Sequence, residues 1–290
     1  MSSIIDDIKS HFFKSGNAVS QLIVINVVVF LALLIPGVLL KMTGLGNLYE
    51  LILSYLALPA FWVEVIFKPW TFITYAFLHE GLFHILFNMM FLYTFGNIIG
   101  DLLGSRRVTS LYIWGAIGGG LVYVLLYNIL PIFNAHLHES MLLGASAAVF
   151  AIVVGAATLS PDYQLYLIII GPVRIKYIAA FYVILSYAQT VGDNPGGNIA
   201  HLGGALMGYL FIKQLQKGND WGKPVHAVIQ FVSSIFKPKP KMRVTYHRPK
   251  ETSNSPTQAE IDKILDKISV SGYESLTKEE KQKLFSASKK

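Results

Sequence analysis

Six apolar segments, separated by more polar connections, occupy most of the chain between residues 18 and 217. The first, residues 18–40, is long enough to cross the roughly 30 Å hydrocarbon core of a bilayer. The others lie at about residues 81–103, 107–130, 143–160, 173–191 and 197–217. Because backbone polar groups in lipid must be satisfied within each segment, the pattern predicts an all-α membrane protein with six transmembrane helices.

The distribution of charge divides the chain. Only 14% of its residues are charged and 53% are hydrophobic, whereas a soluble globular protein is about 25% charged. Charges are sparse before residue 218 and dense after it, where 14 Lys and Arg stand against 8 Asp and Glu. We therefore predict a cytoplasmic amphipathic N-terminus at residues 1–17, a membrane domain at 18–218 and a basic cytoplasmic tail at 219–290.

The same composition limits cofactors and partners. The chain contains no cysteine, which excludes disulfides, thiolate nucleophiles and zinc–thiolate sites, and we expect neither a cofactor nor a metal. Basic residues cluster early in the tail, at Lys237, Lys239, Lys241, Arg243 and Arg248. Beside a membrane, such a cluster more often meets anionic lipid than nucleic acid, so we expect lipid contact and no nucleic acid partner.

Basic residues in the connections predict the orientation of the membrane domain. They lie between the second and third segments, between the fourth and fifth, and at the end of the sixth, at Arg106, Arg107, Arg174, Lys176, Lys213 and Lys217. The opposite connections have no excess of Lys and Arg. The positive-inside rule therefore places both termini in the cytoplasm, in the plasma (inner) membrane if the protein is bacterial.

Two stretches outside the segments have local signals. Residues 43–70 are rich in Trp and Tyr but interrupted by charge and proline, which predicts a structure lying in the headgroup layer. Near the end of the chain, Thr257 with Glu260 and Thr277 with Glu280 match the capping-box pattern that opens a helix. The tail should therefore end in two short amphipathic helices.

Four polar side chains lie within the apolar segments, at His84, Asn88, Ser146 and His201. If the N-terminus is inside, the second, fourth and sixth segments all enter from the outside. His84, Ser146 and His201 then lie at a similar depth, about 5–10 Å below the outer surface at 1.5 Å per residue. Polar groups at such depth are costly and by default mark function.

Ser146 and His201 together suggest acyl-transfer chemistry. A serine hydroxyl is a weak nucleophile until a base within hydrogen-bond reach takes its proton, and histidine is the natural base near neutral pH. Small residues in the fourth segment and the Gly204/Gly208 pair in the sixth would let the two backbones approach closely. Since no carboxylate lies at matching depth, we predict a Ser–His dyad rather than a triad.

His84 and Asn88 are suited to a supporting role. They are four residues apart, about 40° around a helix, and so share a face. Both can donate a hydrogen bond to a developing oxyanion, together with the backbone N–H of Ser146.

Each feature also has a structural explanation. A single serine in a helix of small residues usually serves packing, and His84 with Asn88 would suit a clasp between helices. A zinc site at His79 and His84 is rejected because, on one helix, spacing five puts the two rings about 140° apart. The shared depth of His84, Ser146 and His201 favours a catalytic site.

These motifs resemble those of the rhomboid intramembrane serine proteases. The similarity covers about residues 18–218 and rests on the segment from Trp70 to Arg107, on Gly144-Ala145-Ser146 and on Ala200-His201-Leu202-Gly203-Gly204. It implies a six-helix rhomboid bundle in which Ser146 and His201 are catalytic and His84 and Asn88 support the oxyanion. Substrates would be single-span membrane proteins, cut near the outer end of their helix.

Three positions compare directly with the family pattern. Ala147 stands where the family usually has glycine after the nucleophile, and the family's Trp-Arg pair in the first loop reads Trp70-Thr71. Phe150 falls where the family has an aromatic ring packed on the catalytic histidine. The tail lies outside the similarity.

Two other functions fit parts of the pattern. A catalytically weak or inactive relative that binds single-span clients would normally have lost Ser146 or His201, and both are present. A transporter would require acidic residues at mid-membrane and broken helices in matching halves, and the sequence has neither. The sequence therefore predicts a serine endopeptidase.

Overall fold

The computed structural model describes residues 17–236 and 256–288. The chain divides into two compact units, Met1–Phe236 and Lys237–Lys290. The amphipathic helix expected at residues 1–17 lies outside the described residues, apart from Asn17, and so does the basic cluster from Lys237 to Arg248.

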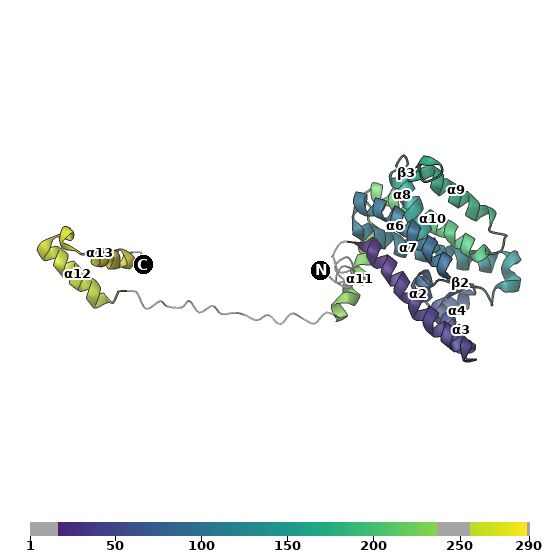
Figure 1. Ribbon diagram of the computed structural model, residues 1–290, viewed down its shortest axis with the longest axis horizontal. Coiled ribbons are helices and arrows are strands. Elements are labelled where there is room, and N and C mark those ends of the chain that lie inside the picture. The colour runs from purple at the N-terminus through teal and green to yellow at the C-terminus, as the bar shows by residue number, and fades with distance from the viewer. Residues whose placement is uncertain (1–16, 237–255, 289–290) are drawn as a thin grey trace. The chain divides into compact units, whose positions relative to one another are not determined.

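Six helices of the first unit coincide with the six predicted segments (Figure 1). They are α2 (Ala18–Met42), α6 (Leu82–Leu103), α7 (Ser105–Ile129), α8 (Ser146–Leu159), α9 (Ile175–Ala188) and α10 (Pro195–Gln216). Within the described ranges, α2, α6 and α7 are long and apolar enough to cross a membrane, while α8 and α9 are apolar but shorter. The number of spans therefore stays a prediction.

Helix α8 lies at the centre of this bundle. It contacts α6, α7, α9 and α10, and nine of its 14 residues are buried. In contrast, α9 buries only Ile175, Ala179 and Ser186, which makes it the peripheral helix beside α8. The first residue of α8, Ser146, is thus held by the most densely packed element of the unit.

The predicted close approach of the fourth and sixth segments is confirmed. A Cβ atom on Gly204 would overlap the carbonyl oxygen of Ala147, and one on Gly208 would overlap that of Ala151. Only glycine therefore lets α10 lie directly against the backbone of α8. This contact sets the distance between the side chains of Ser146 and His201.

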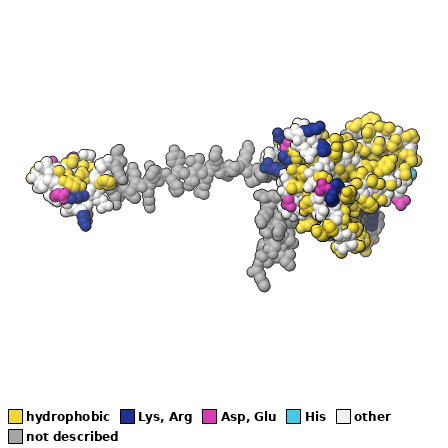
Figure 2. Space-filling model, turned by 90° about the horizontal axis from the view of Figure 1, so that it is seen from above, with side chains coloured by type: hydrophobic (Ala, Val, Ile, Leu, Met, Phe, Trp, Pro, Cys, Tyr) yellow, Lys and Arg dark blue, Asp and Glu magenta, His cyan; other side chains and the backbone are white. Residues whose placement is uncertain are grey.

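The outer surface of the first unit is apolar, as a bundle surrounded by lipid requires. Hydrophobic side chains cover most of the face seen in Figure 2. Large exposed examples are distributed over the helices, at Val28, Ile35, Leu86, Phe87, Phe181 and Ile184. This surface and the apolar helices identify a membrane protein.

The connections contain short helices and strands whose positions the sequence did not indicate. Residues 43–77 form α3 (Gly46–Leu56), β1 (Leu58–Pro59), α4 (Trp62–Phe67), α5 (Thr71–Thr74) and the 3-10 helix η1 (Tyr75–Phe77). β1 pairs antiparallel with β2 (Met141–Leu142), which follows the 3-10 helix η2 (Pro131–His136). A second antiparallel pair, β3 (Gln164–Leu167) with β4 (Gly171–Arg174), joins α8 to α9.

Helix α11 (Gly222–Phe236) follows α10 and packs on α7. Arg107 pairs with Asp220 at 2.9 Å, and the indole N–H of Trp114 donates to the carbonyl of Trp221 at 2.7 Å. His226 Nε2 lies 3.1 Å from the hydroxyl of Ser110. The beginning of the predicted tail is therefore attached to the helical bundle.

The second unit consists of α12 (Gln258–Ser271), the 3-10 helix η3 (Tyr273–Ser275) and α13 (Lys278–Ala287). Both predicted capping boxes are present. The capping glutamate of each helix also pairs with a lysine of the other: Glu260 with Lys283 at 2.8 Å, and Glu280 with Lys267 at 2.9 Å. Two short helices are thus held together at both ends.

Candidate active site

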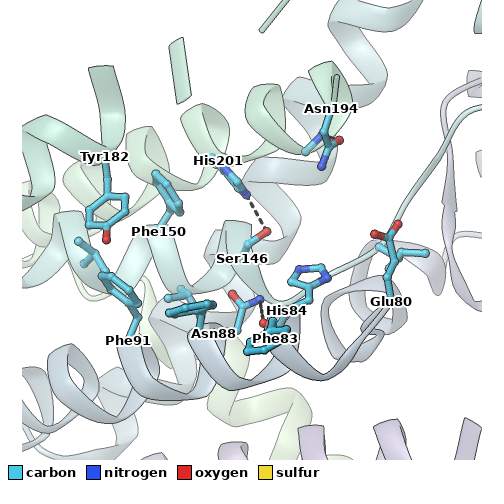
Figure 3. Close-up of a pocket in the computed structure, with 15 residues that line it drawn as sticks. Glu80, Phe83, His84, Asn88, Phe91, Ser146, Phe150, Tyr182, Asn194 and His201 are labelled. Carbon is cyan, nitrogen blue, oxygen red and sulfur yellow. Dashed lines mark hydrogen bonds between the residues drawn. The ribbon is translucent and has the colours of Figure 1, made fainter. Parts of the chain in front are cut away.

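The four polar residues singled out from the sequence line one cavity of about 450 Å³. Ser146 begins α8, His201 lies on α10, and His84 and Asn88 lie on successive turns of α6. In Figure 3 the side chains of His201 and Ser146 point toward one another, with His84 and Asn88 on the facing helix. The rest of the wall is mainly apolar, with Phe83, Phe87, Phe91, Val149, Val153 and Tyr182.

The hydroxyl of Ser146 lies 2.7 Å from Nε2 of His201. The other ring nitrogen of His201, Nδ1, lies 3.2 Å from the hydroxyl of Ser186 on α9. When Nδ1 carries the proton and donates it to Ser186, Nε2 accepts from Ser146 and is free to take its proton. Ser186 therefore occupies the position that an orienting carboxylate has in a triad.

Sequence reasoning missed Ser186. Its residue type is unremarkable, and its helix has no other motif. The available signal was a small polar side chain within an apolar segment, now found to be buried. Only the packing of α9 against α10 reveals its partner.

A phenyl ring packs on one face of the His201 imidazole. Phe150, one turn after Ser146, stacks on His201 with ring centroids 4.3 Å apart and an interplanar angle of 8°. The ring packing expected at Phe150 is thus present. His201 is held by a hydrogen bond at each nitrogen and by an aromatic face.

The loop before Ser146 lies against the ring of His84. Gly144 has a φ of +129°, a backbone conformation that residues other than glycine rarely adopt. Its N–H donates to the carbonyl of Tyr75 at 3.0 Å. A Cβ atom there would lie 3.0 Å from Nε2 of His84 and 3.6 Å from the Ser146 hydroxyl. The glycine leaves open the space between the His84 ring and the Ser146 hydroxyl. It also explains why the helix begins at Ser146 rather than at the predicted residue 143.

Asn88 is the deeper of the two α6 residues, with 7% of its surface exposed. Its side-chain amide donates to the carbonyl of His84 at 2.9 Å. An amide has two N–H groups, so this bond leaves one donor for another acceptor. Asn88 lines the cavity together with Ser146.

His79 contacts His84 but does not belong to α6. Because His79 precedes the helix, the angle of about 140° expected for two residues on one helix is wrong, and the two rings meet edge to face with centroids 5.1 Å apart. Burial, with a smaller contribution from His84, lowers the pKa of His79 to about 4, so its ring is neutral near pH 7. A protein zinc site needs at least three ligands, and the described residues contain no group of three or more His, Cys, Asp or Glu that would hold a metal.

Comparison with known proteins identifies the fold. The rhomboid domain family matches residues 67–217, which is half of the chain and contains all four residues. The chain belongs to the rhomboid family. A second family, described as a family of unknown function (DUF6576), matches residues 253–290, which lie within the second unit.

Similar rhomboid proteins include both mitochondrial and bacterial members. RHOMBOID-like protein 12, mitochondrial, of Arabidopsis thaliana is 31% identical over 51% of this chain and 47% of its own length. Rhomboid protein 1, mitochondrial, of Saccharomyces cerevisiae is 31% identical over 47% of this chain and 39% of its own. Rhomboid protease GlpG of Pectobacterium atrosepticum is 24% identical over 68% of this chain and 62% of its own length. The chain spans about half the length of the first curated relatives that it matches.

The structure shows how this rhomboid domain accommodates two departures from the family pattern. Ala147 is buried, and a Cβ atom on Gly119 of α7 would lie 2.5 Å from its methyl group. The methyl group therefore packs on α7 and does not line the cavity. In the first loop, the indole N–H of Trp70 donates to the backbone carbonyl of Tyr55 at 2.8 Å. The hydroxyl of Thr71 donates to the backbone carbonyl of Lys68 at 2.6 Å.

Proposed function

We propose that this rhomboid protein is an intramembrane serine endopeptidase that cleaves single-span membrane proteins near the outer end of their transmembrane helix. The observation that carries the proposal is the 2.7 Å distance between the Ser146 hydroxyl and Nε2 of His201. A nucleophile and base at this distance, in a cavity lined by two further hydrogen-bond donors, match the requirements of acyl transfer.

The reaction follows from the roles of these groups. The Ser146 oxygen attacks the scissile carbonyl while His201 takes the hydroxyl proton at Nε2. The carbonyl oxygen becomes an oxyanion, which His84, Asn88 and the Ser146 N–H stabilise. The C–N bond then breaks, and His201 gives the proton to the leaving amine. Water attacks the acyl-enzyme with His201 again as base, which releases the acid and restores Ser146.

The proposed orientation places this chemistry below the outer surface. A 14-residue helix such as α8 is about 21 Å long, shorter than the roughly 30 Å hydrocarbon core. With six spans and both termini in the cytoplasm, the end of α8 at Ser146 lies within the outer half of the membrane. A substrate helix must unwind to present a carbonyl there, which favours substrates with small or helix-breaking residues near the cleaved bond.

A fluorogenic transmembrane peptide in detergent or liposomes tests the activity. We expect cleavage by the wild type and none by Ser146→Ala, while Ser54→Ala, a change of a half-buried serine whose hydroxyl bonds within α3, retains wild-type rates. A fluorophosphonate should label the wild type at Ser146 alone. Cleavage by Ser146→Ala would disprove the assignment. Peptide binding without cleavage by the wild type would favour a client-binding rhomboid.

For the tail we propose attachment to the anionic inner leaflet. Support comes from its 14 basic against 8 acidic residues and from the exposed apolar side chains of α11, including Val228, Phe231 and Ile235. A protein truncated after Phe236 keeps the Arg107–Asp220 pair and should cleave peptides in neutral detergent at the wild-type rate. Its affinity for anionic vesicles should fall relative to the full chain, and salt should weaken the difference. Equal affinity of both proteins for such vesicles would contradict the proposal.

A further inference from the structure

A second cavity, of about 460 Å³, adjoins the first. The two share the walls formed by Glu80, His84, Leu143, Asn194 and Gly197. A peptide bond at Ser146 would therefore have the mainly apolar first cavity on one side and the second on the other. A side chain next to the cleaved bond has a direct route into the second cavity.

Aromatic rings form part of its wall. Tyr123 and Tyr127 lie one turn apart on α7 with centroids 4.6 Å apart, and Phe133 of η2 stacks on Tyr127 at 4.4 Å and 9°. All three line the cavity. These rings are 1%, 4% and 7% exposed, so they form a packed wall of the cavity.

The hydroxyl of Tyr123 has no hydrogen-bond partner in the described part of the chain. Tyr123 is 1% exposed, and a phenol buried to this extent normally has a partner. Because the residue lines the cavity, a ligand group entering there would supply the missing partner.

Two carboxylates line the same cavity, Glu80 before α6 and Asp193 before α10. None of the ion pairs found between described residues involves either of them. The lining contains no Lys or Arg, and its histidines are His84 and His136. The field in the cavity is therefore negative, which disfavours an acidic group and favours a cation.

We infer that this second cavity binds a lysine or arginine side chain of the substrate, at a position next to the scissile bond. The inference rests on the proposed protease function and adds a specificity to it. The long aliphatic stem would pass the apolar wall at Leu142 and Ile132, and the charged end would meet the two carboxylates. The Tyr123 oxygen would accept one of its N–H groups.

Matched peptides test this specificity on the full-length protein. One transmembrane peptide is made with Lys, Arg, Met or Glu at each position flanking the cleaved bond. At one of these positions we expect kcat/KM to be at least about tenfold higher for Lys and Arg than for Met, and lowest for Glu. Because recognition precedes chemistry, the difference should lie mostly in KM.

Variants assign the preference to the cavity. Glu80→Gln with Asp193→Asn should reduce the Lys-to-Met ratio to within about twofold, and Tyr123→Phe should reduce it by a smaller factor. Asp162→Asn, at a carboxylate that pairs with Lys176 beside the β3–β4 hairpin, is the matched control and should leave the ratio unchanged. A double variant that keeps the full ratio would overturn the inference.

Binding to Ser146→Ala separates the two hypotheses, because it requires no turnover. Fluorescence anisotropy should give the Lys peptide at least about tenfold tighter binding than the Met peptide. If the wild type cleaves all the peptides at similar rates and Ser146→Ala binds them equally, the specificity is wrong and the protease assignment stands. If the wild type cleaves none of the peptides but Ser146→Ala still binds the Lys peptide more tightly, the protease assignment fails and the cation-binding cavity stands.

Discussion

The phenyl ring of Phe150 lies parallel to the imidazole of His201, at 4.3 Å between centroids and 8° between planes. Phe150 is one turn from Ser146 on α8, so one helix carries the proposed nucleophile and also supports the proposed base. The close contact of α8 with α10 at Gly204 makes this possible. The geometry of the pair is thus a consequence of how two helices pack.

Replacing Phe150 by leucine should lower kcat by about 3- to 10-fold, because an aromatic pair contributes about 0.5–1.5 kcal/mol beyond its buried area. Phe150→Tyr keeps the ring and is the control. The measurement is kcat on a fluorogenic transmembrane peptide. Equal rates for the leucine variant and the wild type would mean that the hydrogen bonds alone orient His201.

Ser146→Ala and His201→Ala should each reduce kcat by at least about 10³-fold, and the double variant should lose no more than either single variant, since the two groups act as one unit. Thermal unfolding in detergent should show that all three remain folded. Losses that multiply in the double variant would indicate that the two residues act independently.

Much of this site was predictable from the sequence because the membrane restricts where polar side chains occur. His84, Asn88, Ser146 and His201 stood out against apolar surroundings, and all four line one cavity. The six apolar segments likewise predicted six helices to within a few residues.

What could not be predicted depends on contacts between distant segments. Ser186 has meaning only through its bond to His201, and the direction of the Ala147 methyl group is set by Gly119 of another helix. Strands β1 and β2 are two residues long and pair across more than 80 positions, which is too little sequence to carry a periodic signal. The contact of α11 with α7 likewise depends on a few individual side chains, such as Trp114 and His226, that form no recognisable sequence pattern.

Asn88→Ala should lower kcat by roughly 10²-fold, as expected when one oxyanion donor is removed. In the structure Asn88 donates one hydrogen bond to its own helix, which leaves its second amide N–H, and the residue lines the cavity. Asn88→Gln, which keeps an amide in an altered position, tests the geometry. A rate within about twofold of wild type for the alanine variant would make Asn88 a structural residue of α6.

Ala147→Gly, which restores the usual glycine of the family, should leave kcat equal or slightly higher, since the methyl group faces α7 rather than the cavity. The converse change, Gly119→Ala, should destabilise the protein, because the two methyl groups would overlap. Thermal unfolding and peptide cleavage distinguish the two effects. A large loss of activity in Ala147→Gly, with stability unchanged, would show that the methyl group shapes the oxyanion site.

The helix pair at the end of the chain should lose stability in acid. Glu260 accepts from Lys283 and from the backbone N–H of Thr257, and these bonds lower the pKa of Glu260 from 4.5 to about 2. The unfolded chain therefore takes up a proton first, so the stabilisation is complete above about pH 4.5 and is lost as the pH falls toward 2. Circular dichroism of a peptide covering residues 253–290 should show helix content falling over this range. Glu260→Gln should lower the helix content at pH 7 and flatten the acid transition, while Glu279→Gln should leave both nearly unchanged. A wild-type peptide whose helix content is the same at pH 7 and pH 2 would show that the ion pairs between the helices do not hold this unit together.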